Sequence, residues 1–90
     1  MAAEVKVYTT TICPYCVRAK ALLAKRGIAY EEINVSNDIA VRDWLVKATG
    51  RKTVPQIFIA GEPIGGSDEL AAMDAKGELV KRVFGEVAPA

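Results

Sequence analysis

Hydrophobic and polar residues alternate in some segments of the chain and recur at helical spacing in others. Alternation over 5–8 predicts a strand, and a similar β-rich pattern returns in 28–35 and 56–60. Hydrophobic residues on one helical face predict helices after Pro14 and over 39–49. In chain order we expect a strand from Val5 that ends in the threonines at 9–11, a helix from Pro14 that stops at Gly27, a strand over 28–35, a helix over 39–49 closed by Gly50, a strand over 56–60, a brief strand at Ile64, a helix capped by Ser67, and a last helix after Gly77 that holds Leu79, Val80, Val83 and Phe84.

The connections between these segments determine how the strands pair. A strand, a helix and a second strand in succession require a right-handed crossover between parallel strands. The three residues Gly61-Glu62-Pro63 leave room only for an antiparallel hairpin. We therefore expect an α/β fold with a four-stranded mixed sheet and helices on both faces. The end of the chain, 88–90, is expected to fray.

Composition and charge narrow the classes of function. The chain has 90 residues, of which 51% are hydrophobic and 26% charged, so we expect a single domain over residues 1–90. A formal net charge of +1 provides no long-range field for a polyanion, so nucleic acid and membranes are not expected as partners. No apolar run has the length of a signal peptide or a membrane span. We expect a cytoplasmic protein that works as a monomer.

The chemistry available to the chain depends on its two cysteines, because it has no histidine. This absence excludes Ser-His and Cys-His nucleophile pairs and His-ligated zinc. The cysteines stand in Cys13-Pro14-Tyr15-Cys16, where a strand is followed by a helix. Cys13 lies at the helix N-terminus, where free N–H groups and the helix dipole favour a thiolate, whereas Cys16 lies one turn further and is shielded. This asymmetry is typical of thiols that exchange disulfides.

Two structural interpretations compete with a redox role for the pair. In one, both cysteines are small hydrophobic side chains in the core, and in the other they are half of a metal site between subunits. The C-x-x-C spacing at a strand-to-helix junction favours redox chemistry over both. Pro14 adds to this because proline fits the first helical turn and stiffens the pair. We predict that Cys13 and Cys16 are catalytic, and we expect no bound metal.

Three motifs occur together in the chain: Cys13-Pro14-Tyr15-Cys16, Thr53-Val54-Pro55 and Gly65-Gly66-Ser67-Asp68-Glu69-Leu70. With them the chain resembles the glutaredoxin family, in its dithiol class, from about Val5 to Phe84. The resemblance implies a thioredoxin-like fold, a redox-active disulfide and an electron-transport enzyme with glutathione as its co-substrate. The protein substrates that it implies are glutathionylated and disulfide-bonded proteins.

The resemblance also implies a glutathione site. A cis Val54-Pro55 bond leaves the backbone groups of Val54 free to pair with the cysteine of glutathione. Ser67 and Asp68 open a helix, where N–H groups and the Asp68 carboxylate meet the γ-glutamyl end. Arg42 stands where members place a Gln or Arg that reaches the glycine carboxylate. The site residues implied are Tyr15, Arg42, Thr53, Val54, Pro55, Gly66, Ser67 and Asp68.

The same residues also have plain structural interpretations. On composition alone, Val54-Pro55 is a trans bend at the start of a strand. Ser67 is an ordinary N-cap, and Asp68 is a favourable acid in the first helical turn. Arg42 belongs to a solvated helix face. These interpretations need no ligand and stay open at this stage.

One position departs from the family. Thr10 stands where members commonly carry a lysine that contacts the thiolate and the glycine carboxylate. The change weakens the electrostatic stabilisation of the thiolate and makes Arg42 more important. Arg51 and Lys52 flank the same groove, but a solvated loop is the better interpretation for both.

Two other functions stay open. One is a redoxin that a thioredoxin-reductase-type flavoenzyme reduces directly. The residues Gly66-Ser67-Asp68 and Arg42 argue against this function, because such a partner needs no γ-glutamyl clamp. The other is a dimer that bridges an iron–sulfur cluster through Cys13 and two glutathione thiols. Pro14 argues against the dimer, because relatives that hold clusters usually have a smaller or less constrained residue there.

Overall fold

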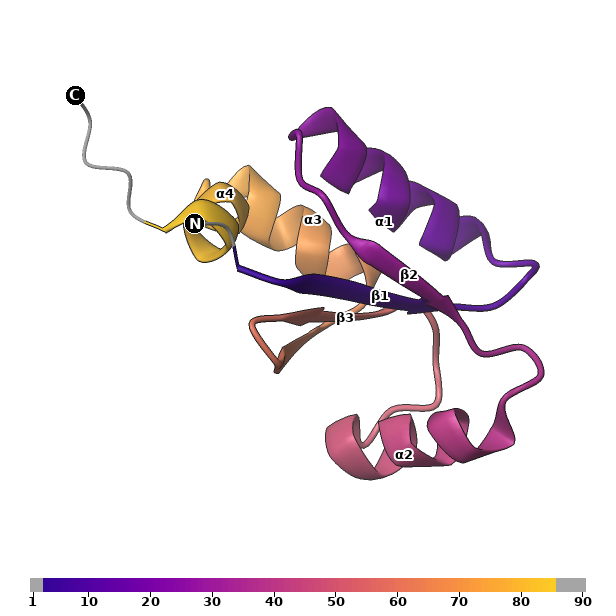
Figure 1. Cartoon of the computed structure of the whole chain (residues 1–90). Helices are drawn as coiled ribbons and strands as arrows, with labels where there is room; N and C mark the ends of the chain where they lie inside the picture. Colours follow the sequence, from indigo (N-terminus) through magenta and orange to yellow (C-terminus); the bar gives the residue numbers. More distant parts are fainter. Residues whose placement is uncertain (1–2, 86–90) are drawn as a thin grey trace.

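The fold is a four-stranded sheet between two layers of helices (Figure 1). A computed structural model describes residues 3–85, and the expected frayed end at 88–90 lies outside the described residues. In chain order the elements are β1 (Val5–Thr9), α1 (Pro14–Lys25), β2 (Glu31–Asn34), α2 (Ile39–Thr49), β3 (Gln56–Ile59), β4 (Glu62–Gly65), α3 (Ser67–Ala75) and α4 (Glu78–Phe84).

The sheet is mixed, as expected. Its strand order is β2-β1-β3-β4, with β1 parallel to β2 and antiparallel to β3, and with β3 antiparallel to β4. Val7 in the centre of β1 lies opposite Glu32 of β2 and Ile57 of β3. Figure 1 shows α1, α3 and α4 on one face of the sheet and α2 on the other. The predicted fold class is therefore confirmed.

Each face of the sheet has its own core, because successive side chains of a strand point to opposite faces. Val7 and Ile57 are fully buried in the larger cluster, with residues of α1, α3 and α4. Tyr8 and Phe58 belong to the smaller cluster on the α2 face. Trp44 of α2 packs on both, with ring centroids 5.9 Å from Tyr8 and 5.6 Å from Phe58. These aromatic contacts hold α2 against the sheet.

The boundaries of two strands differ from the prediction. β2 covers Glu31–Asn34 and not 28–35, because Ile28 packs in the core before pairing with β1 begins. The turn between β3 and β4 is Ala60-Gly61 and not Gly61-Glu62-Pro63, since β4 already begins at Glu62. Ala60 and Gly61 have φ values of 54° and 80°, as the central residues of a two-residue hairpin turn require.

The N-cap of α3 is Gly66 and not Ser67, which is the first helical residue. The Gly66 N–H donates a hydrogen bond to Oε1 of Glu69, at 2.7 Å. The cap is therefore made by a carboxylate that reaches back from the third helical position. The hydroxyl of Ser67 is not needed to start this helix.

Gly65→Ala is expected to destabilise the protein by about 2 to 3 kcal/mol, against about 1 kcal/mol for Gly50→Ala. Both glycines have a positive φ, of 115° at Gly65 and 74° at Gly50. A Cβ at position 65 would lie 2.5 Å from Oε1 of Glu69 and displace the cap of α3, whereas a Cβ at position 50 meets no heavy atom within 4 Å. Urea unfolding of the two variants measures the difference. Equal losses would show that the Glu69 side chain moves aside at no cost.

Candidate active site

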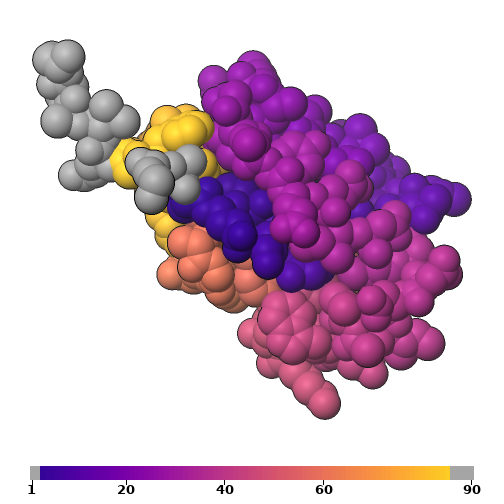
Figure 2. Space-filling view, viewed as in Figure 1, coloured from indigo at the N-terminus to yellow at the C-terminus, as the bar shows by residue number. Residues whose placement is uncertain are grey.

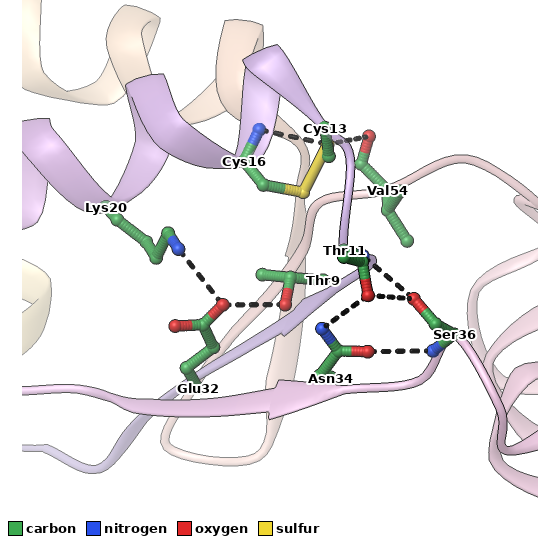
Figure 3. The surroundings of a disulfide bond; sticks show 9 residues. All are labelled: Thr9, Thr11, Cys13, Cys16, Lys20, Glu32, Asn34, Ser36 and Val54. Carbon is green, nitrogen blue, oxygen red and sulfur yellow. Dashed lines mark hydrogen bonds and ion pairs between the residues drawn. A yellow bond between two sulfur atoms is a disulfide. The ribbon is translucent and has the colours of Figure 1, made fainter.

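The two cysteines lie at the junction between β1 and α1. They form a disulfide with a Cα–Cα distance of 5.2 Å (Figure 3). Cys13 is the extended N-cap residue of α1, and Pro14 follows in the first helical turn. Proline suits this position because the first helical N–H groups have no partner within the helix. Cys16 is 2% exposed, whereas Cys13 is half-buried. The predicted placement is confirmed, with Cys13 at the helix start and Cys16 shielded one turn later.

The sulfur of Cys13 lies among backbone groups of the helix start. The Cys16 N–H points at Sγ of Cys13 at 3.1 Å. The carbonyl oxygen of Val54 lies 3.7 Å from the same sulfur (Figure 3). The first turn of α1 holds no acidic residue, so no carboxylate there opposes a negative charge on Cys13. The Cys16 N–H and the positive end of the helix dipole both favour negative charge at this position.

Glu32 of β2 ties the end of β1 to α1. Its Oε2 accepts hydrogen bonds from the hydroxyl of the buried Thr9 at 2.8 Å and from Nζ of Lys20 at 3.0 Å (Figure 3). These partners, first Thr9 and then Lys20, hold the pKa of the Glu32 carboxyl below its usual range. Lys20 lies one helical turn after Cys16, but its ammonium group is paired with Glu32. It does not replace the lysine that is missing at Thr10.

A second polar cluster holds the loop between β1 and Cys13. The N–H of Thr11 donates to Oγ of Ser36 at 2.8 Å, and the two hydroxyl groups lie 3.0 Å apart. Oδ1 of Asn34 accepts the N–H of Ser36 at 2.9 Å (Figure 3). The loop is therefore anchored through Thr11 on the segment after β2. Thr11 directly precedes Ile12 and Cys13.

A groove of about 250 Å³ lies beside the disulfide. Its floor includes the cis peptide bond between Val54 and Pro55, as the resemblance implies. The groove combines residues of the first turn of α1, of the loop before β3 and of the first turn of α3. Its lining residues are Tyr15, Arg51, Thr53, Val54, Pro55, Gly66, Ser67, Asp68 and Glu69.

Seven of the eight residues predicted for glutathione binding thus share one groove. The eighth, Arg42, lines a neighbouring cavity of about 200 Å³. Thr53 and Val54 line both hollows, so the two adjoin at the loop before β3. Lys52 also lines the second cavity. The binding roles of these residues stay predictions, but their side chains and backbone groups are brought together around the disulfide.

Arg51 was expected to flank the groove as part of a solvated loop, and no role in the groove was predicted for Glu69. Nη1 of Arg51 lies 2.7 Å from Oε1 of Glu69, so Arg51 forms an ion pair at the groove while its side chain stays 51% exposed. The N–H of Gly66, and then Arg51, hold the pKa of the Glu69 carboxyl below its ordinary value of 4.5. The stabilisation that accompanies this shift is present above pH 4.5 and is lost as the pH falls through the lowered pKa. Only the spacing of Gly66 and Glu69, an acid three residues after a helix start, signalled this role.

Residues 3–85 lack two kinds of feature. The described chain holds no group of three or more His, Cys, Asp or Glu residues placed to bind a metal ion. Over the same residues, no helix is both long and apolar enough to cross a membrane.

Comparison with known proteins connects this geometry to a family. The family model described as Glutaredoxin matches residues 5–64. Glutaredoxin 3 of Escherichia coli (strain K12) is 49% identical over 77 residues, which is 86% of this chain and 93% of the relative. Glutaredoxin 1 of Rickettsia conorii is 48% identical over 77 residues, an alignment that covers 83% of this chain and 76% of the relative.

Solved structures show the same likeness. The crystal structure of a buckwheat glutaredoxin–glutathione complex has a TM-score of 0.86 and 33% identity, over 91% of this chain and 77% of its own. The solution structure of a glutaredoxin from Brucella melitensis has a TM-score of 0.84 and 39% identity, over 98% of this chain and 96% of its own. By sequence and by structure, the chain belongs to the glutaredoxin family.

Proposed function

We propose that Cys13 and Cys16 carry out the reaction of this glutathione-dependent thiol–disulfide oxidoreductase, with Cys13 as the nucleophile and Cys16 as the resolving thiol. The observation that carries the proposal is the surroundings of Cys13. Its sulfur receives a helical N–H at 3.1 Å and lies 3.7 Å from the carbonyl oxygen of Val54, a residue that lines the groove, whereas Cys16 is 2% exposed. A substrate sulfur therefore reaches Cys13 before it reaches Cys16.

With a glutathionylated protein, Cys13 alone is sufficient. Its thiolate attacks the glutathione sulfur, so a Cys13–glutathione disulfide forms as the bond to the target protein breaks. The target leaves as a thiolate and takes up a proton. The thiolate of a second glutathione then attacks the glutathione sulfur on Cys13, which yields oxidised glutathione and restores the Cys13 thiolate.

With a protein disulfide, both cysteines take part. Cys13 forms a mixed disulfide with one target cysteine, and the other target cysteine leaves as a thiolate. Cys16, one helical turn away, then attacks Sγ of Cys13 and releases the first target cysteine as a thiol. The Cys13–Cys16 disulfide is the oxidised product, and two glutathione molecules reduce it again.

The groove beside Cys13 is the site that we propose for glutathione. The buckwheat relative is described as a glutaredoxin–glutathione complex, which supports a glutathione site in this fold. The free N–H groups at the start of α3 suit the γ-glutamyl carboxylate, and the Asp68 carboxylate suits its ammonium group. Arg42 in the adjoining cavity suits the glycine carboxylate at the other end. The backbone of Val54, beside Sγ of Cys13, suits the central cysteine.

The chemistry also bears on the setting in which the protein works. The dithiol route leaves a Cys13–Cys16 disulfide in each cycle, which requires a reduced glutathione pool of the kind found in cytoplasm. We propose that location, with disulfide-bonded and glutathionylated proteins as substrates and electron transfer from glutathione as the role. All groups named for the reaction come from one chain, so the proposed working form is a monomer.

Reduction of a glutathione mixed disulfide, coupled to NADPH through glutathione reductase, tests the proposed function. We expect turnover in this assay and none when thioredoxin reductase replaces glutathione and glutathione reductase. Turnover with thioredoxin reductase alone would favour a redoxin of the thioredoxin type. A brown, iron-containing dimer after anaerobic purification would favour the cluster-bridging alternative.

Cys13 is expected to be a thiolate at neutral pH. The helix start lowers thiol pKa values from about 8.5 to between roughly 3.5 and 7.5, and the Cys16 N–H points at this sulfur. The rate of alkylation of the reduced protein against pH measures the midpoint. Thr10→Lys should lower the midpoint further, by about half a pH unit, because it adds a positive charge near the sulfur. A midpoint near that of a free thiol would contradict the prediction.

A further inference from the structure

Large apolar side chains are exposed around Cys13. Within residues 3–85, seven large hydrophobic side chains are exposed, and three of them lie within four positions of Cys13: Ile12 at 90%, Tyr15 at 55% and Val17 at 61%. Isolated exposed apolar residues are common, but a group around a reactive atom is typical of an interaction surface. Tyr15 already belongs to the groove. Ile12 and Val17 have no part in the proposed binding of glutathione.

The exposure of Ile12 is built into the fold. On one side, the N–H and hydroxyl of Thr11 are held by Ser36 (Figure 3). On the other side, Cys13 is held as the N-cap of α1, with its carbonyl oxygen accepting the N–H of Val17 at 3.1 Å. Both neighbours of Ile12 are therefore held in place, and the side chain between them is 90% exposed. The segment that follows β1 projects from the molecular surface in the space-filling view (Figure 2).

Val17 is a second exposed apolar residue near Cys13. Residues four apart on a helix lie one above the other, so Val17 lies one turn from Cys13 on the same side of α1. The buried residues of α1, Cys16, Ala19 and Leu23, define the side that faces the core. Neither Ile12 nor Val17 lines the groove beside Tyr15. Ile12, which precedes Cys13, and Val17, one helical turn after it, are therefore exposed apolar side chains near Cys13 that do not belong to the groove.

We propose that Ile12 and Val17 form a docking surface for polypeptide disulfides in which an apolar residue stands next to the attacked cysteine. The proposal rests on the proposed function, since it requires Cys13 to be the nucleophile. In the mixed disulfide, the substrate cysteine is bonded to Sγ of Cys13, so its sequence neighbours must lie on the residues that surround this sulfur. An apolar neighbour removes its own surface and that of Ile12 and Val17 from water, whereas a polar neighbour does not.

Two short peptide disulfides of equal charge, with leucine or serine on both sides of the cysteine, test the docking surface. Bis(2-hydroxyethyl) disulfide is the small substrate without a peptide. Reduced protein is mixed with each disulfide, and the single-turnover rate is followed by acid quenching and mass spectrometry. In each reaction the Cys13–Cys16 dithiol is oxidised to the disulfide, and the substrate is reduced to two thiols.

The variants are Ile12→Ser and Val17→Ser, with Ile39→Ser as the matched control. Ile39 is 74% exposed at the start of α2, so its substitution removes similar apolar surface from a different helix than the one that holds the cysteines. We expect the unmodified protein to reduce the leucine peptide about tenfold faster than the serine peptide. Ile12→Ser and Val17→Ser should each lower the rate with the leucine peptide about 3- to 10-fold and leave the rates with the other two disulfides unchanged. Ile39→Ser should change none of the rates.

Equal rates of the unmodified protein with the two peptides would overturn the docking surface while leaving the proposed function in place. An equal loss in Ile39→Ser would also overturn it, since the effect would then be general surface hydrophobicity. Failure of the unmodified protein to reduce even the small disulfide would overturn the proposed thiol chemistry, and the docking surface with it.

Discussion

Cys13→Ser is expected to abolish both the reduction of glutathione mixed disulfides and the reduction of protein disulfides. A serine hydroxyl does not ionise near neutral pH, so the loss in kcat/KM should exceed about a thousandfold in both assays. Cys16→Ser is expected to keep the first activity and to lose about a hundredfold or more in the second. The reason is their placement, since Cys13 is the half-buried N-cap of α1 beside Val54 of the groove, and Cys16 is buried one turn later.

The comparison of the two serine variants contains its own control, because each substitution replaces one sulfur by one oxygen on the same helix. Cys16→Ser also removes the competing internal disulfide, so its rate with a glutathionylated peptide should equal or exceed that of the unmodified protein. If Cys16→Ser were as inactive as Cys13→Ser in the mixed-disulfide assay, the route through Cys13 alone would be wrong. The thioredoxin-like alternative would then account better for the two cysteines.

Asp68→Ala is expected to raise the KM for a glutathionylated peptide about 5- to 30-fold with little change in kcat. Loss of one partner of a desolvated charge pair costs about 2 to 5 kcal/mol, and an exposed pair costs less. Asp68 is exposed at the start of α3 and lines the groove, which places the expected effect at or below the low end of that range. Arg42→Ala should raise KM about 2- to 5-fold, because Arg42 is exposed in the adjoining cavity.

Glu78→Ala is the matched control for Asp68→Ala. Both residues are acids in the first turn of a helix, so both substitutions remove a similar favourable interaction with the helix dipole. Glu78 begins α4 and does not line the groove. Steady-state kinetics with a glutathionylated peptide and thermal unfolding separate binding from stability. Wild-type kinetics in both Asp68→Ala and Arg42→Ala would place the glutathione site elsewhere.

Local signals were sufficient to predict most of the elements. The helix over 39–49 was predicted with the bounds it has, because Asp38 accepts the Val41 N–H as an N-cap and Gly50 adopts the left-handed conformation that ends it. The β3–β4 turn was wrong because it depends on a positive φ at Ala60, which no local preference of alanine predicts. β2 was too long in the prediction because hydrophobic pattern alone does not show where pairing with β1 begins.

The candidate site divides in the same way. The redox pair was predicted from its spacing at the start of a helix, which is a local feature. Seven residues of the groove were predicted only from the resemblance to the glutaredoxin family, because their local sequence also fits plain structural roles. The ion pair of Arg51 with Glu69 was not predicted, since its members are 18 residues apart and meet only when α3 packs beside the loop before β3.

By itself, the sequence determined the order of elements, the mixed sheet and the thiol chemistry, because helix caps, periodicity and connection lengths act over a few residues. The tertiary structure alone decided which groups share the groove, which charges are neutralised and which apolar side chains stay exposed. The position of Ile12 is one such case, since its exposure depends on Ser36, 25 residues from Thr11. Long-range contacts of this kind form only when β1 and β2 pair, and no local pattern contains them.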